Sequence, residues 1–75
     1  MKKKIFFKEL QKIFEIKKKI NEDFPLNDRI FDSLKILEMI SFQETYFQNL
    51  NIKPSDYKKC KKVGDLVKIL KIKND

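Results

Sequence analysis

The chain of 75 residues contains no histidine, no tryptophan, one cysteine and one glycine. Histidine is the commonest general base and the commonest metal ligand, so both kinds of site lose their usual residue. Cys60 alone cannot form an internal disulfide, and it cannot supply the nitrogen and sulfur ligands of a zinc site. The single glycine, Gly64, excludes the glycine-rich loops that bind phosphate. These absences argue against an enzyme.

Long apolar runs are also lacking. No run approaches the roughly 20 residues that cross a bilayer, and no segment resembles the apolar centre of a secretory signal. We therefore expect a cytoplasmic protein without membrane insertion, and the lone cysteine fits a reducing compartment. Hydrophobic residues make up 41% of the chain and include seven Phe. They are sufficient for one domain spanning residues 1–75.

The net charge of +7 makes nucleic acid one possible partner. The charge is unevenly distributed, because residues 26–52 carry four acidic residues against Arg29 and Lys35. Arg29 is also the only arginine, whereas specific base contacts favour the arginine fork. No segment interleaves basic residues with exposed aromatics for base stacking. A small basic helical module that binds nucleic acid remains the alternative to the function developed below, which involves no nucleic acid.

The rarity of glycine and proline predicts a helical chain. We expect four helices, over residues 2–20, 33–48, 54–57 and 63–71. Asn21–Pro25 breaks the first helix, because the residue before a proline is pushed out of helical geometry, and a loop follows to Phe31. Pro54 suits the first position of the short third helix.

Apolar residues at helical spacing predict which faces are buried. In the first helix these are Ile5, Phe6, Phe7, Leu10, Ile13, Phe14, Ile16 and Ile20. In the second they are Ile36, Leu37, Met39, Ile40 and Phe47, and in the last Val63, Leu66, Val67 and Leu70. Leu34 and Phe42 lie off the core face, and we expect Phe42 to pack against the loop or the first helix. We expect Tyr46 and Tyr57 at the core edge with hydroxyls in solvent, and Cys60 as a small buried side chain.

The sequence Phe31-Asp32-Ser33-Leu34 joins the loop to the second helix. Asp32 is a strong candidate for the N-cap, because its carboxylate can accept hydrogen bonds from the free amides of the first turn. The Ser33 hydroxyl would then lie exposed at the positive end of the helix dipole, where free amides can hold a phosphate. The position permits modification of Ser33 and does not require it.

Asp32-Ser33-Leu34 resembles the Asp-Ser-Leu signature of acyl carrier proteins, in which the serine receives 4′-phosphopantetheine from coenzyme A. The resemblance continues in the run Leu34–Ile40, in Glu44 with Phe47, in Asn51–Asp56 and in Val63–Leu66. It covers nearly the whole chain in order and spacing.

The resemblance implies an all-α, four-helix acyl-carrier-like bundle with three longer helices, a short third helix and a long loop between helices 1 and 2. Ser33 would be the attachment point of 4′-phosphopantetheine, which carries an acyl or aminoacyl group as a thioester. Asp32 would cap the helix and help the transferase hold metal-bound coenzyme A. Leu34, Glu38 and Ser41 would contact partners.

The resemblance also implies that Ile36 and Leu37 line an inner face that shelters acyl chains. The reactive thiol would belong to the prosthetic group, so the chain itself would be no enzyme and would hold no metal. Its partners would be a phosphopantetheinyl transferase and the enzymes that load and transfer the acyl or aminoacyl group, and we expect a monomer.

The basic charge departs from the family, whose members in fatty-acid synthesis are usually acidic along the second helix. Lys35 directly follows the signature, and only Glu38 and Glu44 are acidic in that segment. Either this is a specialised carrier of one dedicated pathway, or the lysine-rich composition has no functional meaning. The sequence leaves both interpretations open.

Overall fold

The computed structural model describes residues 1–74 and contains four helices. They are α1 (Lys3–Phe14), α2 (Ser33–Tyr46), α3 (Pro54–Lys58) and α4 (Val63–Ile69). Within residues 1–74 there is no strand, only isolated bridges between Lys2 and Lys73 and between Pro25 and Lys62. The expected all-α class and the order of long helix, long loop, long helix, short helix and final helix are confirmed. No helix in this part of the chain has the length and apolar character to cross a membrane.

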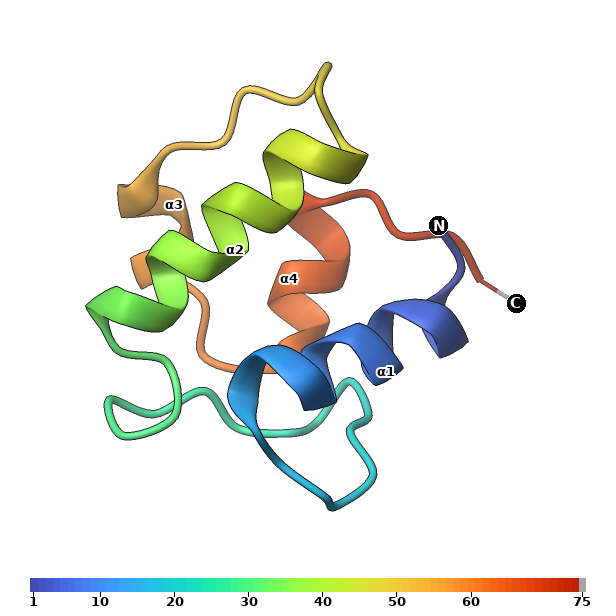
Figure 1. The fold of residues 1–75 in the computed structure, drawn as a ribbon, viewed down its shortest axis with the longest axis vertical. Coiled ribbons are helices and arrows are strands. Elements are labelled where there is room, and N and C mark those ends of the chain that lie inside the picture. Colours follow the sequence, from blue (N-terminus) through green and yellow to red (C-terminus); the bar gives the residue numbers. More distant parts are fainter. Residues whose placement is uncertain (75) are drawn as a thin grey trace.

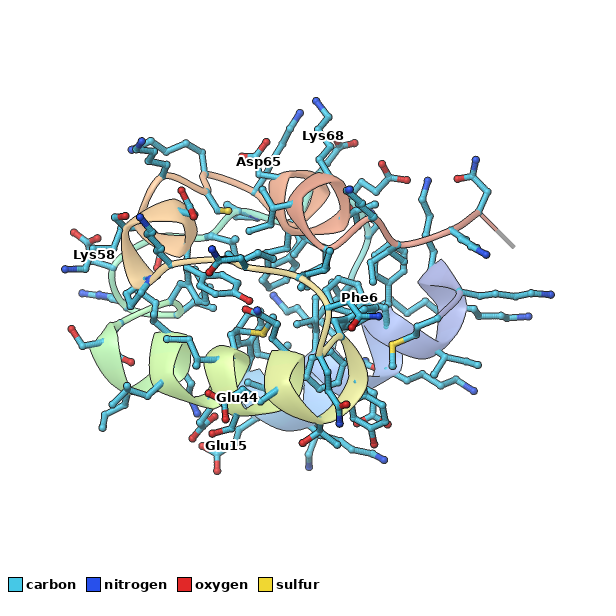
Figure 2. All side chains as sticks on the ribbon, turned by 90° about the horizontal axis from the view of Figure 1, so that it is seen from above. Phe6, Glu15, Glu44, Lys58, Asp65 and Lys68 are labelled. Carbon is cyan, nitrogen blue, oxygen red and sulfur yellow. The ribbon has the colours of Figure 1, made fainter. Side chains whose placement is uncertain are left out.

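The helices surround one core. α2 packs against α1 and against the short α3 (Figure 1). Seen from above, α4 lies on the opposite side of the core from α2, and Phe6 of α1 points between them (Figure 2). The largest fully buried side chains are Tyr57, Phe6, Leu10, Met39, Leu66, Leu70 and Val63. All four helices therefore contribute to one apolar interior.

Helix α1 ends at Phe14, six residues before the predicted end at Ile20. Glu15 adopts the left-handed conformation, with φ 56° and ψ 45°. Its amide donates to the carbonyl of Lys12 at 3.3 Å, and the next amide, of Ile16, donates to the carbonyl of Gln11 at 3.0 Å. This pair of bonds is the Schellman motif that terminates helices. The apolar spacing misled the prediction because part of the irregular segment is buried too.

The other helices begin where the sequence predicted, but α2 and α4 end earlier, whereas α3 ends at Lys58, one residue later than predicted. α2 stops two residues before the predicted Gln48, and α4 stops at Ile69, two residues before Lys71. Lys71, two residues after the end of α4, has a positive φ of 53°, as Glu15 does after α1.

The long loop between α1 and α2 is tied to the segment around the start of α4. The Leu26 amide donates to the Lys61 carbonyl at 2.9 Å, and the Val63 amide donates to the Phe24 carbonyl at 2.9 Å. The Gly64 amide donates to the Glu22 carbonyl at 2.8 Å. A Cβ on Gly64 would stand only 3.1 Å from that carbonyl oxygen, which accounts for the chain's one glycine.

Several burial predictions are corrected by the structure. Ile5 and Leu37 were expected on the core face, but they are 54% and 60% exposed. Phe42 was expected off that face and is buried, with its ring centroid 6.0 Å from that of Phe6, so its predicted packing on α1 is confirmed. The buried arc of α2 is thus rotated toward Phe42 and away from Leu37. Tyr57 is fully buried, so its predicted wet hydroxyl is wrong.

Candidate functional site at the start of α2

Ser33 is the first residue of α2, and its side chain is exposed. Before it, Asp32 has extended backbone geometry, and its Oδ1 accepts a hydrogen bond from the Lys35 amide at 3.0 Å. The predicted N-cap is confirmed. Phe31 is buried against the rings of Phe14 and Tyr57, with centroids 5.9 and 6.5 Å away. An anchored aromatic and a capped helix therefore fix the serine from both sides.

A tight turn over Asn27–Phe31 ends the loop directly before α2. The Asn27 side-chain oxygen accepts from the amides of Arg29 and Ile30, at 3.0 and 3.1 Å. The Asn27 carbonyl also accepts from the Phe31 amide at 2.8 Å. Asparagine favours such turns because its side chain can replace a backbone acceptor. The direction from which the chain enters α2 is thus set locally.

Beside Ser33 lies a cavity of about 410 Å³. Its lining combines acidic, basic and apolar side chains: Asp28, Asp32, Ser33, Lys58, Lys61, Leu26, Phe31, Ile36 and Cys60. The apolar members are all buried. A group attached to the serine oxygen would therefore meet apolar surface and charges of both signs.

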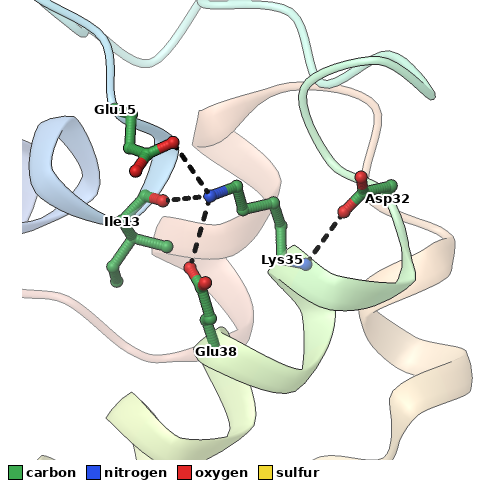
Figure 3. A network of polar contacts seen from close by, with 5 residues as sticks. All are labelled: Ile13, Glu15, Asp32, Lys35 and Glu38. Carbon is green, nitrogen blue, oxygen red and sulfur yellow. Dashed lines mark hydrogen bonds and ion pairs between the residues drawn. The ribbon is translucent and has the colours of Figure 1, made fainter.

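Lys35 connects the start of α2 to the end of α1 (Figure 3). Its Nζ donates to the Ile13 carbonyl at 2.8 Å and lies 3.5 Å from a carboxylate oxygen of Glu38 and 3.9 Å from one of Glu15. Its side chain is only 19% exposed. Lys35 directly follows Asp32-Ser33-Leu34 in sequence, but its ammonium group points toward α1. Glu15 and Glu38 partly neutralise its charge.

The outer side of α2 presents the residues predicted to contact partners. Leu34 is 69% exposed beside Ser33, and Glu38 and Ser41 are exposed on the same helix. Of the two residues predicted for an inner face, Ile36 is buried and lines the cavity, whereas Leu37 lies outside with Leu34. The prediction for Leu37 is therefore wrong, because the buried arc of α2 faces α1 and α3.

Sequence reasoning missed a buried polar pair behind the site. The Tyr57 hydroxyl donates to Gln43 Oε1 at 2.5 Å, and Gln43 Nε2 donates to the Leu50 carbonyl at 2.9 Å. Burial raises the pKa of Tyr57 to about 12, with smaller contributions from Cys60 and Asp56. A signal was present, because Gln43 follows Ile36 and Met39 by seven and four residues and so shares their helix face.

Sequence reasoning also missed that Lys58 and Lys61 line the same cavity as Ser33. It treated them only as neighbours of Cys60. No local pattern could reveal that α3 packs against α2.

Cys60 is buried, as predicted. Burial raises the pKa of its thiol to about 11, with smaller contributions from the carboxylates of Asp65 and Asp56. Its Sγ lies 3.6 Å from the Asp56 carbonyl, within donating distance. A protonated, buried thiol is a poor nucleophile, so the flanking lysines do not activate it.

Within residues 1–74 no cluster of acidic and cysteine side chains could hold a metal ion. The site does fit a phosphorylated group on Ser33, because an exposed hydroxyl, a cavity and two cations lie together. Comparisons with protein-family models, curated proteins and solved structures found no match to this chain.

Proposed function

We propose that the chain is an acyl carrier protein, in which Ser33 bears 4′-phosphopantetheine and presents a thioester-bound acyl or aminoacyl group to partner enzymes. One observation carries the proposal: Ser33 is exposed at the first residue of α2, behind the Asp32 cap and beside a cavity. The resemblance of Asp32-Ser33-Leu34 to the carrier signature, within a four-helix chain that has the matching long loop, supports it.

The position of Ser33 suits a phosphodiester. The first amides of a helix have no partner within the helix, and its N-terminus carries a partial positive charge. Asp32 occupies the Lys35 amide, which leaves the earlier amides of the turn for another acceptor. A phosphate on the Ser33 oxygen would lie next to them.

Loading would be a phosphoryl transfer. The Ser33 oxygen forms a bond to the phosphorus next to the pantetheine of coenzyme A, and the diphosphate link breaks. Adenosine 3′,5′-bisphosphate leaves, and the serine proton passes to a base of the transferase. The bound group supplies the thiol that forms the thioester. The role of this chain is to position the Ser33 oxygen. The capped start of α2 fixes the serine, and the buried Phe31 anchors the loop before it.

We propose a phosphopantetheinyl transferase and loading and acyl-transferring enzymes as partners, each docking on the exposed side of α2. Leu34 and Leu37 offer apolar surface there, with Glu38 and Ser41 beside them. Because the Lys35 side chain points toward α1, it places no positive charge on the exposed side of α2. The chain's net charge of +7 fits a specialised carrier better than one of bulk fatty-acid synthesis.

The test is a change of mass. The purified chain is incubated with coenzyme A and a broad-specificity phosphopantetheinyl transferase, and we expect one added prosthetic group. Ser33→Ala removes the acceptor and should gain no mass. Ser55→Ala, which changes an exposed serine of α3 that does not line the cavity, should load normally. No gain in the wild-type chain, or an equal gain in Ser33→Ala, contradicts the proposal. Salt-sensitive binding of DNA without any mass gain would favour the nucleic-acid alternative.

A further inference from the structure

We propose that Lys58 and Lys61 form an anion-binding wall that neutralises the phosphodiester on Ser33. The inference rests on the proposed function and extends it to a site built by α3 and the α3–α4 loop. Both lysines line the cavity that holds Ser33, although they stand 25 and 28 positions later in the chain. Figure 2 places Lys58 at the same end of the molecule as the start of α2.

The backbone beneath both lysines is fixed. Tyr57, directly before Lys58, is fully buried against Phe31. The Lys61 carbonyl accepts from the Leu26 amide at 2.9 Å, and its amide donates to Asp65 Oδ2 at 2.8 Å. The two side chains therefore extend from anchored positions, which reduces the entropy lost when they bind an anion.

The charges of the cavity explain why cations are needed there. Asp28 and Asp32 already bring two carboxylates to its lining, and a phosphodiester on Ser33 would add a third negative charge. Lys58 and Lys61 are the cationic side chains in that lining, and neither forms an ion pair within residues 1–74. Lys35, in contrast, is engaged with Glu15 and Glu38. The two lysines are thus available to offset the repulsion.

The experiment compares loaded and unloaded protein. Wild type and the Lys58→Gln/Lys61→Gln double variant are each loaded with 4′-phosphopantetheine, and loading is verified by mass. We then measure the melting temperature of the loaded form minus that of the unloaded form at low salt. In the double variant this difference should fall by about 2–8 °C, because two partly exposed ion pairs are lost. The ³¹P resonance of the phosphodiester should also move.

A matched control removes the same charge elsewhere. Lys18→Gln/Lys19→Gln changes two exposed lysines that do not line the cavity, and it should leave the difference and the resonance at the wild-type values. At 0.5 M salt the effect of the cavity lysines should shrink. Normal loading with equal values in the wild type and the cavity variant overturns this inference alone. No mass gain in the wild type overturns the proposed function and the inference with it.

Discussion

Tyr57 and Gln43 bring polar atoms into a core that is otherwise apolar. The Tyr57 ring is fully buried, and its hydroxyl reaches the Gln43 side chain, which in turn bonds the Leu50 carbonyl. No buried side-chain nitrogen or oxygen within residues 1–74 lacks a partner. The pair therefore joins α3 to α2 and to the loop between them through one buried and one partly buried hydrogen bond.

Tyr57→Phe should destabilise the protein although it keeps the ring. Gln43 Oε1 would lose its donor, and an unsatisfied buried acceptor costs about 1–3 kcal/mol. Thermal unfolding followed by circular dichroism should show a clear fall in melting temperature. Tyr46→Phe is the control, because Tyr46 is 56% exposed and its loss of a hydroxyl should change little. Equal losses in the two variants would mean that the buried bond contributes nothing specific.

Cys60 should make stability depend on alkaline pH. Its pKa is raised from an ordinary 9.0 to about 11 by burial. A raised pKa in the folded state contributes stability that is fully present below pH 9 and is lost as pH rises through 11. We expect denaturant unfolding to show a loss of about 2 kcal/mol across that range. Tyr57, with its pKa near 12, adds a loss at higher pH.

Cys60→Ala separates the thiol from the other titrating groups. The variant should lose less stability between pH 9 and 11 than the wild type, whatever its starting level. If the free energy of unfolding of the variant depends on pH as steeply as that of the wild type, burial does not raise the pKa of the Cys60 thiol.

At the scale of elements, the ends of α1 and the start of α2 are set by different forces. α2 starts after the N-cap residue Asp32, which can be recognised in the sequence. α1 ends where Glu15 takes the left-handed conformation, which glycine adopts readily and glutamate does not. Lys35 then donates to the Ile13 carbonyl near that end. The end of α1 thus depends on a contact from a distant part of the chain.

Glu15→Gly should stabilise the protein by about 0.5–1 kcal/mol, because glycine removes the steric cost of the left-handed conformation. Glu15 is 84% exposed and lies 3.9 Å from Lys35, so little attraction is lost. Lys12→Gly is the matched control, since it places glycine inside α1 and should destabilise by about 1 kcal/mol. Melting temperatures that fall equally in both variants would contradict this account of Glu15.

This contrast explains how far the sequence could predict the fold and the site. Asp32, Pro54 and the apolar spacing act locally, so they placed Ser33 and the starts of α2 and α3 correctly. The end of α1 has no glycine to mark it. The exposure of Leu37 and the position of Lys58 in the lining of the cavity beside Ser33 depend on how α2 packs against α1 and α3. Such contacts between distant segments leave no local pattern.

For the whole molecule, positive charge is in excess. The net charge is +7, and within residues 1–74 the ion pairs engage few of the lysines. Repulsion among like charges destabilises a compact state, and salt screens it. The melting temperature should therefore rise by a few degrees, about 2–5 °C, between 20 and 200 mM sodium chloride. Choline chloride should produce the same rise, and a fall with either salt would contradict the prediction.

The bonds that join the long loop to the start of α4 have a consequence for motion. Amides that donate hydrogen bonds between two segments exchange slowly with deuterium only while the segments stay together. The donors Leu26, Val63 and Gly64 link two stretches that stand far apart in sequence. Their exchange should follow the unfolding of the entire molecule. The loop between α1 and α2, although irregular, would then be a rigid segment that leads to Ser33.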